Sequence, residues 1–188
     1  HSRIKQQVDE VIERVNVGNV YVNRNQVGAV VGSQPFGGEG LSGTGPKAGG
    51  LHSLHGYSQS LSYGGTNDLP LELYESSIKV HELVAPEIEF DDNLLAKLKH
   101  SFSTIDPRFF DFLVETMQTF TSKHLLPGPT GESNELSYHA KGCVLCLGPT
   151  PNDALEQAIM SLALGNSIIA ILSEKDHSSL VGLGFAEK

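Results

Sequence analysis

Residues 143–172 read CVLCLGPTPNDALEQAIMSLALGNSIIAIL, and this stretch decides the fold class of the second half of the chain. Two short apolar runs, 143–147 and 167–172, are typical of buried strands. Between them, small and branched apolar residues recur at helical spacing over 151–164. A strand, a helix and a second strand within about thirty residues form a βαβ unit with parallel strands and a right-handed crossover. The pattern therefore predicts an α/β fold.

Local signals place the ends of the central helix. Thr150 can cap it, Pro151 fits its first turn, Asp153 completes a capping box, and Gly165 ends it. Because all these signals are local, they predict the helix independently of what it packs against.

Outward from this unit, the sequence predicts several further elements and three segments. The elements are an amphipathic helix near 4–15, strands at 19–23 and 77–83, helices at 93–100 and 107–123, and a turn-rich connection at 125–134. We assign 1–63 to one domain, 64–92 to a linker or boundary, and 93–188 to a second, partial domain. The first helix needs a partner surface, and an apolar pattern starts again at 178–188, so we expect an α/β structure that is incomplete at both ends.

Charge and hydropathy exclude some classes of function. The chain has 22 acidic and 13 basic residues, a net charge of -9, and its basic residues are scattered. Binding to a phosphate backbone needs a basic stripe, so we expect no nucleic-acid partner. No apolar run approaches the roughly 20 residues that cross a bilayer, and the first residues do not resemble a secretory signal. We predict a cytoplasmic protein without a transmembrane segment.

The cysteines and two closely spaced histidines raise the question of a metal site. Cys143 and Cys146 have C-x-x-C spacing, but on a strand residues three apart point to opposite faces, so the two thiols would not meet. His52 and His55 have no further donors close in sequence, whereas zinc takes four ligands. We therefore predict no metal site.

The segment 18–50, GNVYVNRNQVGAVVGSQPFGGEGLSGTGPKAGG, carries the chemical information of the chain. Glycine loses more conformational freedom on folding than any other residue, so a cluster of glycines indicates turns or close approach to a ligand. Successive amides in such a segment can form an anion-binding concavity. A binding loop is the interpretation that these residues favour.

These residues closely resemble the dehydrogenase domain of the proline utilization A family. The core pattern P-F-G-G-x-x-x-S-G recurs in the wider aldehyde dehydrogenase superfamily, and here it comprises Pro35, Phe36, Gly37, Gly38, Ser42 and Gly43. The later stretches 128–148 and 154–171 are similar to the C-terminal aldehyde-dehydrogenase-like domain of longer members, which has a nucleotide-domain fold without the catalytic site. The resemblance implies the tail of a catalytic domain followed by a Rossmann-like βαβ domain.

The resemblance also implies a function for three residues. In the family, glutamate semialdehyde is oxidised to glutamate by a cysteine nucleophile and hydride transfer to NAD. Gly28 and Ala29 match the loop whose amides hold the substrate's α-carboxylate, and Phe36 matches the aromatic residue along its aliphatic stem. The alternative is that Gly28 and Phe36 only shape the turn and fill the core. The family's catalytic cysteine lies upstream of residue 1, so we expect no catalytic residue here and no activity of this chain alone.

Cofactors and assembly are expectations of the same kind. NAD and FAD are implied for the full-length protein, as is a homo-oligomer, but no cofactor-binding residue is expected in this segment. Ile171 stands where relatives have a lysine that reaches the ribose, and the G-x-G-x-x-G at 38–43 lacks a flanking helix. The second domain is expected to be a lid or assembly module. The alternative function is a noncatalytic interaction protein or an amino-acid-binding paralogue.

Overall fold

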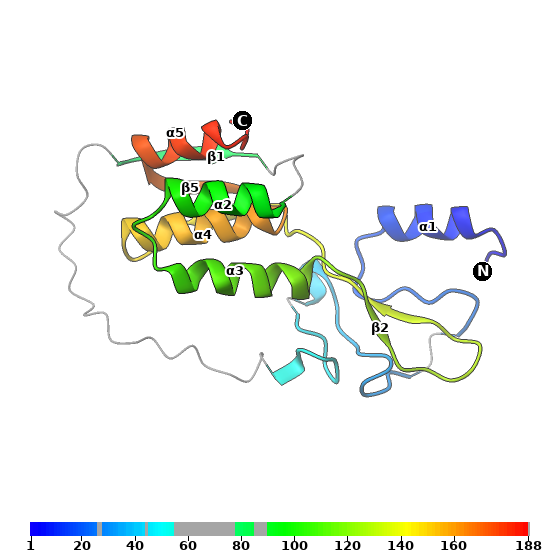
Figure 1. The fold of residues 1–188 in the computed structure, drawn as a ribbon. Coiled ribbons are helices and arrows are strands. Elements are labelled where there is room, and N and C mark those ends of the chain that lie inside the picture. The colour runs from blue at the N-terminus through cyan, green and yellow to red at the C-terminus, as the bar shows by residue number, and fades with distance from the viewer. Residues whose placement is uncertain (26–27, 44, 55–77, 85–89, 188) are drawn as a thin grey trace. The chain divides into compact units, whose positions relative to one another are not determined.

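The computed structural model describes residues 1–25, 28–43, 45–54, 78–84 and 90–187. The chain forms two compact units, which we describe separately. The first comprises residues 1–65 and 124–136, and the second comprises residues 66–123 and 137–188 (Figure 1). The fold is mixed α/β, as the sequence predicted.

The second unit contains a three-stranded sheet in the order β1-β5-β4. Its strands are β1 (Ile78–Leu83), β4 (Cys143–Cys146) and β5 (Ser167–Ser173). Strands β4 and β5 are parallel and are joined by helix α4 (Pro151–Ala163), so the predicted βαβ unit is confirmed. Strand β1 pairs antiparallel with β5. The strand predicted at 77–83 is therefore present, and it belongs to the sheet of the second unit.

Side-chain caps fix the helices of this unit. The remaining helices are α2 (Asp92–Ser101), α3 (Pro107–Phe120) and α5 (Glu174–Gly182). In α4, the backbone amide of Asp153 donates to Thr150 Oγ1 at 3.2 Å, and the amide of Thr150 donates to Asp153 Oδ2 at 3.0 Å. This is the predicted capping box. Asp91 caps α2 by accepting from the amide of Leu94 at 2.7 Å.

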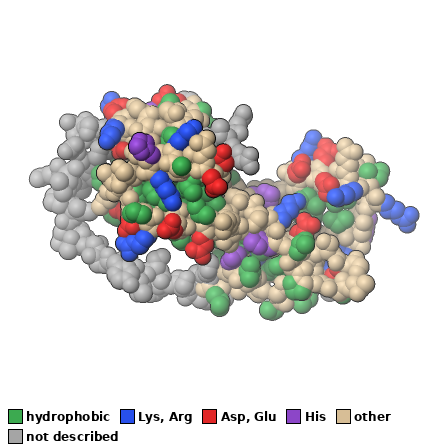
Figure 2. All heavy atoms as spheres, viewed as in Figure 1, with side chains coloured by type: hydrophobic (Ala, Val, Ile, Leu, Met, Phe, Trp, Pro, Cys, Tyr) green, Lys and Arg blue, Asp and Glu red, His purple; other side chains and the backbone are tan. Residues whose placement is uncertain are grey.

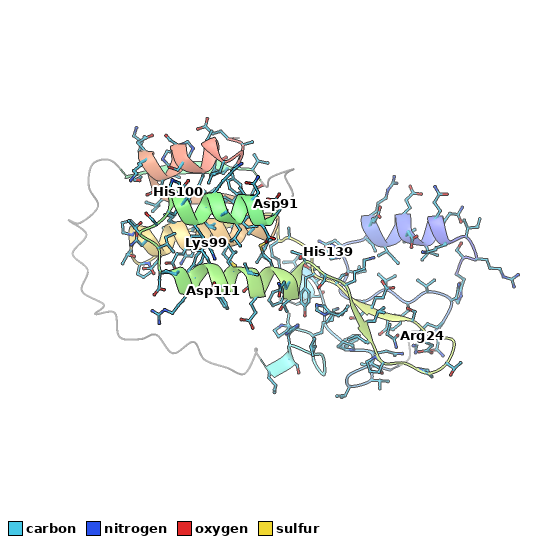
Figure 3. The ribbon with its side chains drawn as sticks, in the orientation of Figure 1. Arg24, Asp91, Lys99, His100, Asp111 and His139 are labelled. Atoms are coloured by element: carbon cyan, nitrogen blue, oxygen red, sulfur yellow. The ribbon has the colours of Figure 1, made fainter. Side chains whose placement is uncertain are left out.

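One continuous apolar core holds the second unit together. Its most buried large side chains include Phe110, Leu113, Leu162, Ile168, Leu172, Leu180 and Phe185. Alternate residues of β5 are buried, because one face of the sheet packs against α4. Outside this core the charges of the two signs are interspersed on the face drawn in Figure 2. Lys99 on α2 and Asp111 on α3 form one such pair, with Nζ and Oδ1 3.8 Å apart (Figure 3).

The described residues of the first unit form little regular structure. They contain helix α1 (Lys5–Arg14), a short 3-10 helix η1 (Gly40–Ser42), and a hairpin of β2 (His124–Leu126) and β3 (Asn134–Leu136). Helix α1 lies within the predicted range, but it buries no residue, and Ile4 and Val11 are 56% and 54% exposed. The amphipathic pattern predicted the helix correctly, but the partner surface expected for its apolar face is not found among the described residues.

One prediction about this unit is wrong, and another is incomplete. Residues 19–23 form no strand: Asn23 has a positive φ of 55°, which turns the backbone, and the side chain of Asn19 is bonded to backbone groups of the glycine-rich segment. Residues 125–134 are more than a connection, since strands β2 and β3 pair across them. The hairpin was missed because Pro and Gly dominate its sequence and each strand is only three residues long.

Candidate functional site

The glycine-rich segment folds around a tight turn at residues 30–34. The amide of Val30 donates to the carbonyl of Gln34 at 3.1 Å, and the amide of Gln34 donates back at 2.8 Å. At its tip, Gly32 has φ +81° and donates to the carbonyl of Gly49 at 2.8 Å. A positive φ is accessible to glycine without strain, so this residue permits the turn.

A second pair of backbone bonds closes the segment after the turn. The amide of Phe36 donates to the carbonyl of Ala48 at 3.1 Å, and the amide of Ala48 donates to Phe36 at 2.9 Å. Asn19 also joins this region, because its side-chain amide donates to the carbonyl of Pro35 at 3.0 Å and its Oδ1 accepts from the amide of Gly37 at 3.3 Å. The residues around Phe36 are thus fixed from two sides.

The side chain of Lys47 bonds both to the glycine-rich loop and to the residues that precede it. Its Nζ donates to the carbonyl of Gly18, to Asn19 Oδ1 at 3.1 Å and to the carbonyl of Gly37 at 3.2 Å. Burial lowers the pKa of Lys47, and the charge of Glu39 acts in the opposite direction. An ammonium group with three acceptors links two chain segments that are far apart in sequence.

Close backbone approach explains the glycines of the P-F-G-G-x-x-x-S-G pattern. A Cβ on Gly38 would lie 2.3 Å from Ser42 Oγ, and one on Gly43 would lie 2.9 Å from the carbonyl oxygen of Gly38. The hydroxyl of Ser42 donates to the carbonyl of Glu39 at 2.8 Å and accepts from its amide at 3.1 Å. These pattern residues hold the loop, and none of their contacts requires a ligand.

The three residues predicted to contact substrate flank the turn. Gly28 and Ala29 precede it and are exposed, with Gly28 at φ +86°, and Phe36 follows it with 58% of its surface exposed. Within the described residues, the amides of Gly28 and Ala29 have no hydrogen-bond acceptor. Among the described residues, Phe36 is not part of a buried core.

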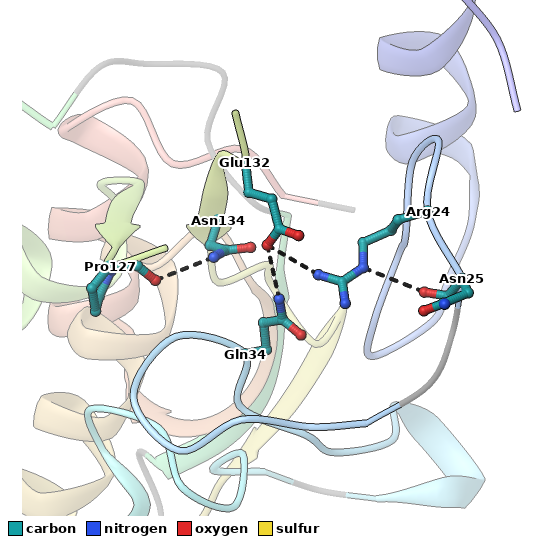
Figure 4. A network of polar contacts seen from close by, with 6 residues as sticks. All are labelled: Arg24, Asn25, Gln34, Pro127, Glu132 and Asn134. Atoms are coloured by element: carbon teal, nitrogen blue, oxygen red, sulfur yellow. Dashed lines mark hydrogen bonds and ion pairs between the residues drawn. The ribbon is translucent and has the colours of Figure 1, made fainter. Parts of the chain in front are cut away.

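The β2–β3 hairpin contributes a residue that the sequence did not suggest. Glu132 Oε2 accepts from Arg24 Nη1 at 3.2 Å and from Gln34 Nε2 at 3.2 Å, while Arg24 Nε donates to the carbonyl of Asn25 at 3.3 Å (Figure 4). Glu132 therefore joins both ends of the segment that contains Gly28 and Ala29. No local pattern could have predicted this contact, since Glu132 lies 108 residues from Arg24.

The two cysteines lie on different sides of strand β4, as predicted. Cys143 is exposed and Cys146 is buried, and both are free. Burial raises the pKa of the Cys146 thiol, and its sulfur lies 3.8 Å from Ser161 Oγ. A thiol of this kind is a poor nucleophile, because the thiolate is the reactive form.

Comparison with known proteins matches most of the first part of the chain to a known family. The aldehyde dehydrogenase family profile matches residues 1–62. Bifunctional protein PutA of Salmonella typhimurium is 38% identical over 178 residues, which cover 90% of this chain, and that of Escherichia coli K12 is 36% identical over 169 residues. The chain is a PutA homologue. The resemblance inferred from the glycine-rich segment is thereby confirmed.

The PutA relatives are much longer than this chain. The match covers 13% of the Salmonella and Escherichia PutA proteins. A 1-pyrroline-5-carboxylate dehydrogenase of Geobacillus sp. is 51% identical over 49 residues, which cover 26% of this chain and 10% of that protein.

Among the described residues, none of the helices has the length and apolar character needed to cross a bilayer.

Proposed function

We propose that this chain is part of an NAD-dependent dehydrogenase that oxidises glutamate semialdehyde, formed from pyrroline-5-carboxylate, to glutamate in proline catabolism. The observation that carries this proposal is the match of residues 1–62 to the aldehyde dehydrogenase family, together with relatives named PutA and 1-pyrroline-5-carboxylate dehydrogenase. The complete protein would use NAD for this step, carry FAD for proline oxidation, assemble as a homo-oligomer and act in the cytoplasm.

Within this reaction, the first unit supplies the substrate anchor. The amides of Gly28 and Ala29 bind the α-carboxylate, and the ring of Phe36 packs along the aliphatic stem. Exposed amides before the turn, the exposed ring after it and the fixed backbone between them support this assignment. Charge-assisted hydrogen bonds from backbone amides are strong enough to orient a carboxylate.

A chimeric enzyme tests the anchor. This chain would replace the matching segment of Salmonella PutA, and semialdehyde oxidation would be measured with Ala29→Pro and Phe36→Ala. Loss of the amide or of the ring should raise KM for the semialdehyde about tenfold or more and leave KM for NAD unchanged, because only substrate binding is weakened. Leu41→Ala is the matched control, since Leu41 is exposed in the same unit and has no assigned role. Unchanged KM in both variants would contradict the anchor.

The chemical step itself requires a cysteine outside these residues. Cys146 is buried with a raised pKa, and Cys143 lies on the opposite side of the same strand. We therefore expect the isolated chain to reduce no NAD in the presence of glutamate semialdehyde. Saturable NAD reduction that survives Cys143→Ser would contradict this expectation, and reduction abolished by that substitution would identify an unexpected nucleophile.

For residues 93–188 we propose a noncatalytic lid or assembly role. One face of the sheet in the second unit carries apolar side chains that no described helix covers, with Val80 and Leu145 exposed by 69% and 60%. Large exposed apolar residues on one face of a sheet, here on its two outer strands β1 and β4, are typical of surfaces that another segment covers. In the chimera, Leu145→Glu should impair coupled proline oxidation more than semialdehyde oxidation. Phe112→Glu, at an equally exposed position on α3, is the control, and equal effects would contradict the lid.

The alternative is a paralogue that binds an amino acid without converting it. In that case, glutamate should bind the 188-residue chain alone and shift the amide resonances of Gly28 and Ala29, and the chimera should be inactive. An active chimera excludes this alternative.

A further inference from the structure

Two histidines and two carboxylates meet in the second unit, far from the glycine-rich segment in sequence. His81 lies on β1, Glu174 and His177 lie on α5, and Glu187 lies in the C-terminal segment. One ligand atom from each of His81, Glu174 and His177 falls within 4.8 Å of the other two. Glu187 Oε1 lies 3.0 Å from His177 Nε2.

The fold fixes these residues through backbone pairing. His81 is paired with the buried Ala170 of β5, so it projects from the face of the sheet that carries the core. Helix α5 begins directly after β5, where Ser173 accepts from the amide of Asp176 at 3.1 Å, and this places His177 over β1. The amide of Val84 donates to the carbonyl of Ala186 at 2.8 Å and holds Glu187 nearby.

One nitrogen in this cluster is buried without a hydrogen bond. Nε2 of His81 has no partner among the described residues, and its ring stacks on that of His177 with centroids 3.8 Å apart and planes 18° apart. His177 is 9% exposed. Buried polar atoms in folded proteins are normally satisfied, so an unsatisfied imidazole nitrogen in a residue that lies beside a second imidazole and a carboxylate points to a missing ligand.

We propose that His81, His177 and Glu174 bind a divalent transition-metal ion of the zinc type, with Glu187 as a further ligand or as the carboxylate that orients His177. Imidazole nitrogen and carboxylate oxygen suit zinc, which binds them at roughly 2.0–2.2 Å in a tetrahedron. Ligand atoms in such a tetrahedron lie roughly 3.4 Å apart, so the donors must close in from their present spread. One of the two stacked rings must also turn, because each lone pair lies in the plane of its ring.

The ion pair of Glu174 with Lys79 is weak enough for a metal ion to replace it. Glu174 Oε1 lies 2.6 Å from Lys79 Nζ, and these side chains are 50% and 64% exposed. Exposed ion pairs contribute little to stability, so the carboxylate can turn from Lys79 to a metal ion. The charge of Lys79 opposes a bound cation, whereas Glu174 and Glu187 together balance the two charges of the ion.

The sequence analysis predicted no metal site, and this inference departs from it. The donors that it considered, the C-x-x-C cysteines and His52 with His55, are close in sequence. The donors here come from a strand and a helix that are distant in sequence and become neighbours only through the pairing of β1 with β5. A bound ion would join β1, α5 and the C-terminal segment.

Calorimetric titration of Zn²⁺ into the metal-free 188-residue chain tests the site. We expect one ion per chain at micromolar Zn²⁺, and His81→Gln should weaken binding at least tenfold. His100→Gln is the matched control, because His100 is an exposed histidine at the end of α2 and is outside the cluster. No binding at micromolar Zn²⁺, or His81→Gln binding as tightly as the control, would overturn the proposal.

Two further measurements separate ligation from a structural role. Co²⁺ in place of Zn²⁺ should give the intense visible absorption of a four-coordinate ion, and this absorption should be lost in His81→Gln and kept in His100→Gln. Lys79→Gln should strengthen Zn²⁺ binding several-fold, because Glu174 loses its competing partner. Weaker binding by Lys79→Gln would argue against Glu174 as a ligand, and a cobalt spectrum unaffected by His81→Gln would overturn the site.

Discussion

The two units of this chain are stabilised by different kinds of interaction. The second unit buries a continuous set of apolar side chains from β1, β4, β5 and the surrounding helices. The first has a helix with no buried residue and depends on backbone hydrogen bonds, close glycine contacts and polar side chains such as Lys47. The stabilisation from apolar burial scales with the area removed from water, whereas a close backbone contact is possible only where a glycine has no Cβ atom.

This difference suggests how each unit should respond to substitution. The core of the second unit should tolerate changes that conserve volume and should fail when a cavity is created. The loop of the first unit should be sensitive to added methyl groups and lost hydrogen bonds. The variants below test this contrast, and hydrogen exchange resolved by peptide measures each unit separately.

The largest effect is expected in the core of the second unit. Phe110→Ala should lower the free energy of unfolding of this unit by about 3–5 kcal/mol, because Phe110 is 2% exposed and truncation leaves a cavity. Phe112→Ala on the same helix should cost no more than about 0.5 kcal/mol, since Phe112 is 59% exposed. Urea unfolding of both variants measures this difference. Similar losses for the two would mean that the core does not dominate.

Backbone contact should dominate in the first unit. A Cβ on Gly18 would lie 1.9 Å from the carbonyl oxygen of Gly37, so Gly18→Ala should destabilise the unit by about 1–3 kcal/mol. Gly182→Ala, on α5, meets no atom within 4 Å and should stabilise the second unit by about 0.4–1 kcal/mol. Faster amide exchange in peptides covering residues 18–50 reports the first effect. Unchanged exchange there would show that the loop can shift.

How much could be predicted from the sequence follows the same division. The β4–α4–β5 unit was predictable because its strands are apolar runs and its helix carries a complete capping box. Strand β1 was located, but its antiparallel pairing with β5 depends on contacts between distant residues. The hairpin β2–β3 pairs residues that are close in sequence, and it was missed because each strand is only three residues long and the connection is rich in Pro and Gly. Helix α5 was predicted only as an apolar pattern, because few of its residues are buried.

The residues of the candidate site could also be predicted only in part. Gly28, Ala29 and Phe36 were predicted because their segment resembles a known family, and the structure adds that all three are exposed beside a fixed turn. Glu132 could not be found, because a carboxylate in a turn-rich stretch has no pattern that indicates its partner 108 residues away. The last part of the first predicted domain, residues 55–63, lies outside the described residues, and so does His55, which was considered as a metal donor.

A smaller effect is expected from the polar support of the first unit. Lys47→Met removes the ammonium group that binds the carbonyls of Gly18 and Gly37 and Oδ1 of Asn19, and should cost about 1–2 kcal/mol. Exchange of the Gly37 amide should accelerate, since its acceptor is Asn19 Oδ1. Lys5→Met on the exposed helix α1 is the control. Equal behaviour of the two variants would assign the stability of the loop to its backbone bonds alone.

The smallest effect concerns charge at the edge of the second unit. Burial, and then the charges of Asp153 and Asp106, raise the pKa of Glu156 on α4 above its usual value of 4.5. The protonated form is therefore favoured in the folded state, and this contribution is present below pH 4.5 and is lost as the pH rises through the folded pKa. Glu156→Gln should consequently stabilise the unit slightly at pH 7 and have no effect near pH 4. Glu115→Gln, at an exposed position on α3, is the control variant, and urea unfolding measures both. If Glu156→Gln destabilised the unit at pH 7, the carboxylate would have a favourable partner, and charge would support the apolar unit as it supports the glycine-rich one.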